Sequence, residues 1–264
     1  MDEIEVEGFR IAYHKQGEGP PLVLLHGWPA NSREWRRQID GLSDQFTIVA
    51  WDAPGAGLSS DPPDSFRLSD WAECLAKFVA ALGLERPHVA GLSWGGGLAL
   101  EFYRRHPEVP RTLILVSAYA GWAGSLPPDV VEERLQLFLR NTELPPDQWP
   151  LTYLRTLVSE HAPDDVFDEI RSIVAELHPV ATRTAIRAFA VADLRGVLAD
   201  IDVPTLLVYG EDDVRAPQDV WHPLHSTLCD SKLVLIPGVG HMIDLEAGDR
   251  LNTEIRSFLG AIPG

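Results

Sequence analysis

The sequence is poor in cysteine, with two among 264 residues, and it lacks the side-chain patterns typical of a bound metal. Cys74 and Cys229 lie in unrelated segments, so we expect no disulfide framework and a reduced, cytoplasmic setting. None of the nine histidines belongs to a pair that flanks a glutamate at helical spacing. The sequence therefore predicts neither a disulfide-stabilised domain nor a zinc site.

Basic residues are also scarce. Lys and Arg total 22 against 39 Asp and Glu, which gives a formal net charge of -17 at pH 7. Such a surface repels phosphates, so we expect no nucleic acid and no anionic membrane as a partner. Residues 1–5 lack the basic and apolar regions of a signal peptide, and no apolar run is long enough to span a bilayer. The expected partner is a small-molecule substrate, and no pattern specifies an oligomeric state.

Short apolar runs alternate with helical patterns along most of the chain. Residues 4–6 and 9–14 alternate apolar and polar side chains around Glu7-Gly8, which predicts an antiparallel hairpin. The run at 22–25 is continuously apolar, as expected for a strand buried on both faces. Further apolar runs predict strands at 46–51, 88–92, 112–117, 205–209 and 233–236.

Strands that alternate with helices imply right-handed crossovers, and therefore a mostly parallel, doubly wound α/β sheet of eight strands. Residues 119–195 carry helical patterns and proline pairs without a strand signal, and they are too many for a simple connection. We predict a core domain made of residues 1–118 and 196–264. Residues 119–195 are then a helical cap inserted after the sixth strand, over the edge of the sheet where ligands bind in such folds.

The segment Gly91-Leu92-Ser93-Trp94-Gly95 lies between an apolar run and a helical pattern. G-x-S-x-G in that setting is the nucleophile elbow, a sharp turn that raises a serine hydroxyl above the end of the sheet. The two glycines lack Cβ atoms and let strand and helix approach each other around the serine. The alternative is a glycine-rich turn in which Ser93 only caps the helix.

A serine hydroxyl needs a base to become a nucleophile, and the base needs an acid to orient it. In the fold with this elbow, the acid and then a histidine follow the serine along the chain. Two later strands end in suitable loops, Gly210-Glu211-Asp212-Asp213 and Gly238-Val239-Gly240-His241. Asp244 and Glu246 follow this histidine, and we expect them to be favourable charges near the start of the final helix.

Together these segments resemble the α/β-hydrolase superfamily over essentially the whole chain. The matching motifs are H-G-W-P, D-A-P-G-A-G-L-S, G-L-S-W-G-G, G-E-D-D-x-x-x-P and G-x-G-H-x-x-x-L-E. The resemblance implies an α/β-hydrolase fold with a catalytic triad of Ser93, Asp213 and His241. In the pattern of the superfamily the acid stands three residues after the strand-ending glycine and four before a proline, and the resemblance therefore favours Asp213. Asp212 is the alternative acid, with turn hydrogen bonding as its expected role.

By the same resemblance, the oxyanion hole consists of the backbone N–H groups of Trp28 and Trp94, whose indoles would add apolar wall to the pocket. His26 is expected to be structural, and Asp52, Gly55 and Gly57 to form a tight loop beside the site. Within the predicted cap, three aromatic residues are the candidates for substrate contact: Tyr119, Trp122 and Phe138.

The activity that the resemblance implies is hydrolysis of a small to medium, largely apolar carboxylic ester through an acyl-enzyme, with no cofactor and no metal. The serine differs from epoxide hydrolases and haloalkane dehalogenases, which have aspartate at this position. H-G-W-P is similar to cofactor-free haloperoxidases, and S-W-G-G to proline iminopeptidases. Lactonase, carbon–carbon bond hydrolase, perhydrolase and aminopeptidase activities use the same triad and stay open. A slow-turnover ligand receptor that signals through the cap is the alternative from another class.

Overall fold

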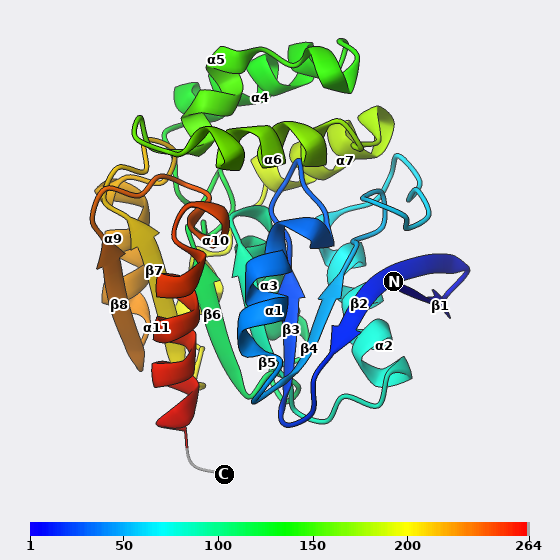
Figure 1. Cartoon of the computed structure of the whole chain (residues 1–264). Coiled ribbons are helices and arrows are strands. Elements are labelled where there is room, and N and C mark those ends of the chain that lie inside the picture. The colour runs from blue at the N-terminus through cyan, green and yellow to red at the C-terminus, as the bar shows by residue number, and fades with distance from the viewer. Residues whose placement is uncertain (263–264) are drawn as a thin grey trace.

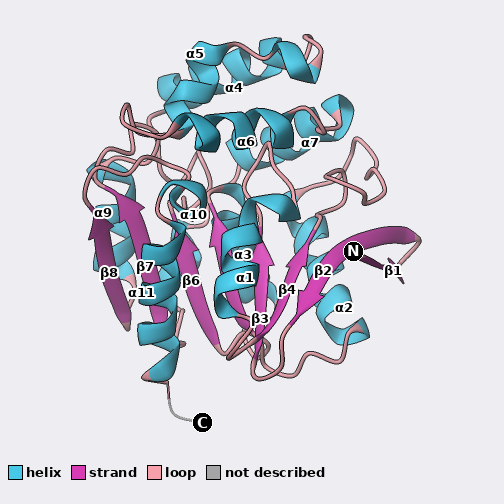
Figure 2. Ribbon diagram, viewed as in Figure 1, coloured by secondary structure: helices cyan, strands magenta, loops and turns pink. Residues whose placement is uncertain are grey.

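The computed structural model describes residues 1–262 and contains a single eight-stranded sheet in the order β1-β2-β4-β3-β5-β6-β7-β8. Strand β2 pairs antiparallel with β1 and β4, and the remaining neighbours are parallel. The predicted eight-stranded, mostly parallel sheet is therefore confirmed (Figure 2). The strands are β1 (Asp2–Val6), β2 (Phe9–Gln16), β3 (Pro21–Leu25), β4 (Thr47–Trp51), β5 (His88–Leu92), β6 (Thr112–Val116), β7 (Thr205–Gly210) and β8 (Ser231–Ile236).

The hairpin and the buried strands follow from simple local rules. Val6 pairs with Phe9 across a two-residue turn in which Glu7 and Gly8 both have positive φ, the geometry that matches the twist of a hairpin. In β3, successive side chains point to opposite faces, so Leu24 joins the core on one side of the sheet and Val23 the core on the other.

Helices cover both faces of the sheet. Helices α1 and α11 pack on one face, and α2, α3 and α9 pack on the other. A short 3-10 turn, η1 (Ser32–Trp35), leads into α1, so the first crossover helix is shorter than a continuous pattern would be. The helices outside the connection between β6 and β7 are α1 (Arg36–Leu42), α2 (Leu68–Ala81), α3 (Trp94–Arg105), α9 (Gln218–Thr227), α10 (Ile243–Glu246) and α11 (Gly248–Gly260).

The long connection between β6 and β7 contains helices and no strand. Figure 1 shows α4 to α7 lying above the carboxyl ends of the parallel strands. Its helices are α4 (Pro128–Asn141), α5 (Leu151–Leu154), α6 (Asp164–Val174), α7 (Pro179–Ala190) and α8 (Arg195–Leu198). Within residues 1–262, no helix is both long and apolar enough to cross a bilayer.

Candidate active site

The turn between β5 and α3 holds Ser93 in a backbone conformation that few residues adopt. Its φ is 52° and its ψ is -108°, and its N–H donates to the carbonyl of Val116 at 2.9 Å. A Cβ at Gly91 would clash with the carbonyl of Gly95, and one at Gly95 with the carbonyl of Leu25, so both positions require glycine. The Ser93 side chain makes no capping hydrogen bond to the helix and lines a cavity instead. Ser93 occupies the N-cap position of α3, but its side chain does not cap the helix, so the alternative of a purely capping serine is not supported.

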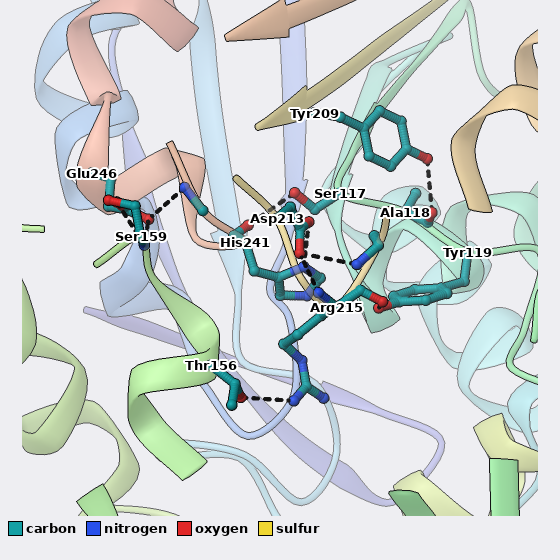
Figure 3. A network of polar contacts seen from close by, with 12 residues as sticks. Ser117, Ala118, Tyr119, Thr156, Ser159, Tyr209, Asp213, Arg215, His241 and Glu246 are labelled. Carbon is teal, nitrogen blue, oxygen red and sulfur yellow. Dashed lines mark hydrogen bonds and ion pairs between the residues drawn. The ribbon is translucent and has the colours of Figure 1, made fainter. Parts of the chain in front are cut away.

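His241 and Asp213 form a buried pair at the ends of the last two strands (Figure 3). The histidine Nδ1 lies 2.8 Å from Asp213 Oδ2, and the two residues are only 3% and 4% exposed. The other carboxylate oxygen accepts the backbone N–H groups of Arg215 at 2.8 Å and Ala216 at 2.9 Å. Burial alone would raise the pKa of Asp213, but the charge of His241 and these hydrogen bonds hold it below its usual value. An ionised Asp213 can therefore orient the histidine.

Asp212, the alternative acid, lies outside this arrangement. Its side chain is exposed, and its backbone N–H donates to the carbonyl of Val239 at 3.0 Å. That bond joins the loop after β7 to the loop that carries His241.

The loop that carries His241 is held by two side chains whose roles the sequence did not reveal. The Ser117 hydroxyl donates to the His241 carbonyl at 2.9 Å. Glu246 accepts the backbone N–H of Gly240 at 3.0 Å and that of Ser159 at 3.0 and 3.1 Å, so it joins this loop to the β6–β7 connection. Glu246 therefore holds the His241 loop in place through hydrogen bonds and is not simply a charge near the start of a helix. Its place in the G-x-G-H-x-x-x-L-E motif was the available signal.

The predicted oxyanion loop packs tightly around His26. The backbone N–H of Ala53 donates to its Nε2 at 3.0 Å, so the ring hydrogen is on Nδ1, which faces the Gly27 carbonyl at 2.6 Å. Burial lowers the pKa of His26, which keeps the ring neutral. The indoles of Trp28 and Trp94 pack edge to face at 4.9 Å, and both residues line the cavity with Ser93. His26 itself does not line it, in keeping with a structural role.

The loop that begins at Asp52 is also held in shape by hydrogen bonds and close contacts. Asp52 accepts the backbone N–H groups of Ser32 at 2.8 Å and Leu58 at 2.9 Å. A Cβ at Gly57 would overlap the Asp52 carboxylate, and one at Gly55 would meet Ala181 of α7. Glycine at both positions allows the loop to close and the β6–β7 connection to pack against it.

The cavity beside Ser93 encloses about 530 Å³, including space open to solvent. Trp122, one of the three candidates for substrate contact, lines this cavity. Tyr119 does not, although its ring lies 6.1 Å from the His241 ring. Phe138, the third candidate, does not line the cavity. Its ring packs against Trp149 at 5.3 Å and Tyr153 at 5.8 Å within the helices above the cavity. The lining residues that the sequence did not reveal are Glu34, Leu157, Ile170, Ile173, Val174, Ile186, Phe189, Arg215 and Met242.

Two buried carboxyl groups lie behind the predicted oxyanion loop. Glu34 Oε1 accepts the Gly27 N–H at 2.7 Å, while Glu34 Oε2 and both oxygens of Asp244 have no partner among residues 1–262. Both residues are fully buried. Burial and the neighbouring Asp244 raise the pKa of Glu34 well above its usual value, and burial raises that of Asp244 to about 8. Near neutral pH this pair carries less than two negative charges, so Asp244 differs from the favourable charge that we expected near the start of the final helix.

The raised pKa of Asp244 predicts that the stability of the protein depends on pH. Asp244 has its usual pKa of about 4 in the unfolded chain, so folding takes up a proton above that pH, and stability falls as the pH rises towards about 8. We expect the stability of Asp244→Asn relative to wild type to rise by several kcal/mol between pH 5 and pH 9, because asparagine has no carboxyl proton to lose. Urea unfolding across this range measures the difference.

The other charged groups near Asp244 are Glu34, Arg37 and Glu169, of which the last two form an ion pair at 2.6 Å. None of these is changed in the variant. Asp249→Asn, an exposed carboxylate at the start of α11, is the matched control and should follow wild type at every pH. A constant difference between Asp244→Asn and wild type from pH 5 to 9 would contradict the prediction.

The described residues contain no group of three His, Cys, Asp or Glu side chains arranged to hold a metal ion. A serine on a nucleophile elbow and a histidine–carboxylate pair lie at one cavity above the carboxyl ends of the parallel strands. These are the features of a hydrolase with a serine nucleophile elbow.

Comparison with known proteins places the chain in a family. The family model described as alpha/beta hydrolase fold matches residues 20–247. Haloalkane dehalogenase 2 of Mycobacterium tuberculosis is 30% identical, over 95% of this chain and 92% of its own. The chain belongs to the α/β-hydrolase family, and it is a hydrolase.

Solved structures agree with this assignment. A thermophilic esterase from Thermogutta terrifontis is 26% identical, with a TM-score of 0.91 over 98% of both chains. A bromoperoxidase from Bacillus anthracis is 22% identical, with a TM-score of 0.88 over 96% of both chains, which is a likeness of fold.

Proposed function

We propose that this protein is a serine carboxylesterase that cleaves small to medium, largely apolar esters. The observation that carries the proposal is that Ser93 and His241 line the same apolar cavity, with His241 held at 2.8 Å from the buried Asp213. Similarity to the esterase from Thermogutta terrifontis supports the choice of an ester. The similarity to a haloalkane dehalogenase does not extend to the chemistry, because alkyl-enzyme formation in those enzymes uses an aspartate where this chain has Ser93.

In the proposed mechanism, His241 Nε2 accepts the proton of the Ser93 hydroxyl as its oxygen attacks the ester carbonyl. The ionised Asp213 accepts the Nδ1 hydrogen and stabilises the imidazolium that forms. The backbone N–H groups of Trp28 and Trp94 bind the oxyanion of the tetrahedral intermediate. Protonated His241 then donates to the leaving alcohol, and a water molecule activated by the same histidine hydrolyses the acyl-enzyme.

Active-site labelling tests this proposal. A fluorophosphonate is expected to modify the wild-type protein once, on Ser93, and to abolish hydrolysis of p-nitrophenyl acetate and butyrate in proportion to the modified fraction. Mass spectrometry of the digested protein locates the adduct, and absorbance follows the p-nitrophenolate. Modification elsewhere, or full activity in the modified protein, would refute Ser93 as the nucleophile.

A panel of substrates separates the activities that share these residues. Simple esters, lactones, aminoacyl arylamides and aryl ketones are assayed in parallel, and we expect multiple turnovers on simple esters to be fastest. A single slow turnover on every ester, with the product retained, would favour the receptor over the enzyme.

A further inference from the structure

Arg215 brings a positive charge to the cavity that contains Ser93. It lies two residues after Asp213 in the loop that follows β7, and its side chain lines the cavity together with Ser93 and His241. Its Nε is buried and has no hydrogen-bond partner among residues 1–262. A guanidinium is always charged in a protein, so this unpaired donor belongs to a cation.

The contacts of the guanidinium are neutral groups. Its Nη1 donates to the Thr156 hydroxyl at 3.1 Å (Figure 3), and its carbon lies 5.3 Å from the centre of the Tyr153 ring. No ion pair joins it to a carboxylate within the described residues. Asp213 is the nearby acid, and its two oxygens are used by His241 and by backbone N–H groups.

The ionised Asp213 adds one negative charge near Arg215, but the surroundings also add a positive one. A second cation, Arg134, donates to the backbone carbonyl of Arg215 at 3.0 Å and to the Tyr119 hydroxyl at 3.3 Å. Glu34 is the acidic residue among those that line the cavity, and burial raises its pKa well above the usual value. In a chain with a net charge of -17, this end of the cavity therefore has a local excess of positive charge.

A partly buried guanidinium without an ion pair is costly, and an anion that enters the cavity and pairs with it would reduce that cost. The planar fork of a guanidinium matches a carboxylate in geometry, and charge-assisted hydrogen bonds of this kind are about twice as strong as neutral ones. A phosphate ester would bring about two charges into an otherwise apolar cavity with one guanidinium among its lining residues. A carboxylate matches the single charge better.

We propose that Arg215 binds a carboxylate of the substrate, so that the preferred substrates are small esters that carry a free carboxylate elsewhere in the molecule. This inference rests on the proposed esterase function and makes its substrate class more specific. The apolar lining accommodates the carbon chain between the carboxylate and the ester, and Arg215 sets which end of the substrate faces away from Ser93.

The test compares half-esters with neutral esters of the same shape. Monomethyl succinate, glutarate and adipate are each paired with methyl butanoate, pentanoate and hexanoate, in which a methyl group replaces the carboxylate. Arg215→Gln is expected to lower kcat/KM for the best half-ester by about 10- to 100-fold, chiefly through KM, and to leave its neutral partner almost unchanged. A pH-stat assay follows the acid released from both kinds of ester.

Two further variants separate recognition from folding. Arg155→Gln removes an exposed guanidinium that stacks on Phe167 at 5.3 Å and does not line the cavity, so both ester series should behave as in wild type. Arg215→Lys keeps the charge and should restore part of the preference for half-esters. Equal losses on both series in Arg215→Gln, or a wild-type preference for the neutral esters, would overturn the proposal.

Binding measured without turnover distinguishes a failure of this proposal from a failure of the esterase function. Calorimetry on Ser93→Ala is expected to detect monomethyl glutarate, and the double variant with Arg215→Gln should bind it at least about 10-fold more weakly. If the wild-type protein hydrolyses no ester but this difference persists, the esterase function fails and the carboxylate site stands. If hydrolysis occurs and both proteins bind the half-ester equally, the carboxylate site fails.

Discussion

Ser93→Ala is expected to lower kcat for ester hydrolysis by about 10⁶-fold, the size of effect seen when the nucleophile of a serine hydrolase is removed. Without the hydroxyl, no acyl-enzyme can form, and the remaining rate comes from binding and the oxyanion donors. Because the Ser93 side chain makes no capping hydrogen bond, its removal should leave the melting temperature close to that of wild type. Initial rates on p-nitrophenyl acetate and a thermal melt measure both quantities.

Ser65→Ala, at an exposed position before α2, is the matched control and should keep full activity. A Ser93→Ala protein that is folded and turns over esters at a rate near that of wild type would rule out the acyl-enzyme mechanism. Residual activity of the Ser93→Ala sample that disappears on fluorophosphonate treatment, with the label on another protein, would instead report a contaminating serine hydrolase.

The parts of the site that could be predicted are those determined by local backbone geometry. Gly91 and Gly95 are required by close approaches between β5, α3 and the end of β3, and such requirements leave a fixed spacing in the sequence. Asp213 and His241 each follow the end of a parallel strand. Parallel strands bring their carboxyl ends to one edge of the sheet, so distant residues meet there without any knowledge of side-chain packing.

The parts that could not be predicted depend on how the β6–β7 connection packs. Phe138 and Trp122 are both aromatic residues of that connection, yet one lies among Trp149 and Tyr153 and the other lines the cavity. Which face of a helix points to the cavity depends on contacts with helices distant in sequence. Asp244 is a second example. Its carboxyl group is buried because α10 packs against η1 and α1, and its position in the helix alone does not reveal that burial.

Asp213→Asn is expected to lower kcat/KM by about 10⁴-fold, because the hydrogen bonds around the carboxylate determine which way the new amide points. Oδ1 accepts the N–H groups of Arg215 and Ala216, so an asparagine places its oxygen there and its NH₂ group towards His241. That amide donates to Nδ1 of His241, so the ring hydrogen moves to Nε2. With its hydrogen in place, Nε2 can no longer accept the proton of Ser93.

Asp212→Asn is the matched control, since Asp212 is the adjacent acid and differs in being exposed. We expect kcat/KM for p-nitrophenyl butyrate to stay near wild type in this variant, while Asp213→Asn keeps a normal fold and loses activity. An NMR measurement of the His241 ring nitrogens in Asp213→Asn should show the hydrogen on Nε2. A large loss in Asp212→Asn with a small one in Asp213→Asn would transfer the orienting role to Asp212, and an unchanged tautomer would contradict the mechanism given for the loss.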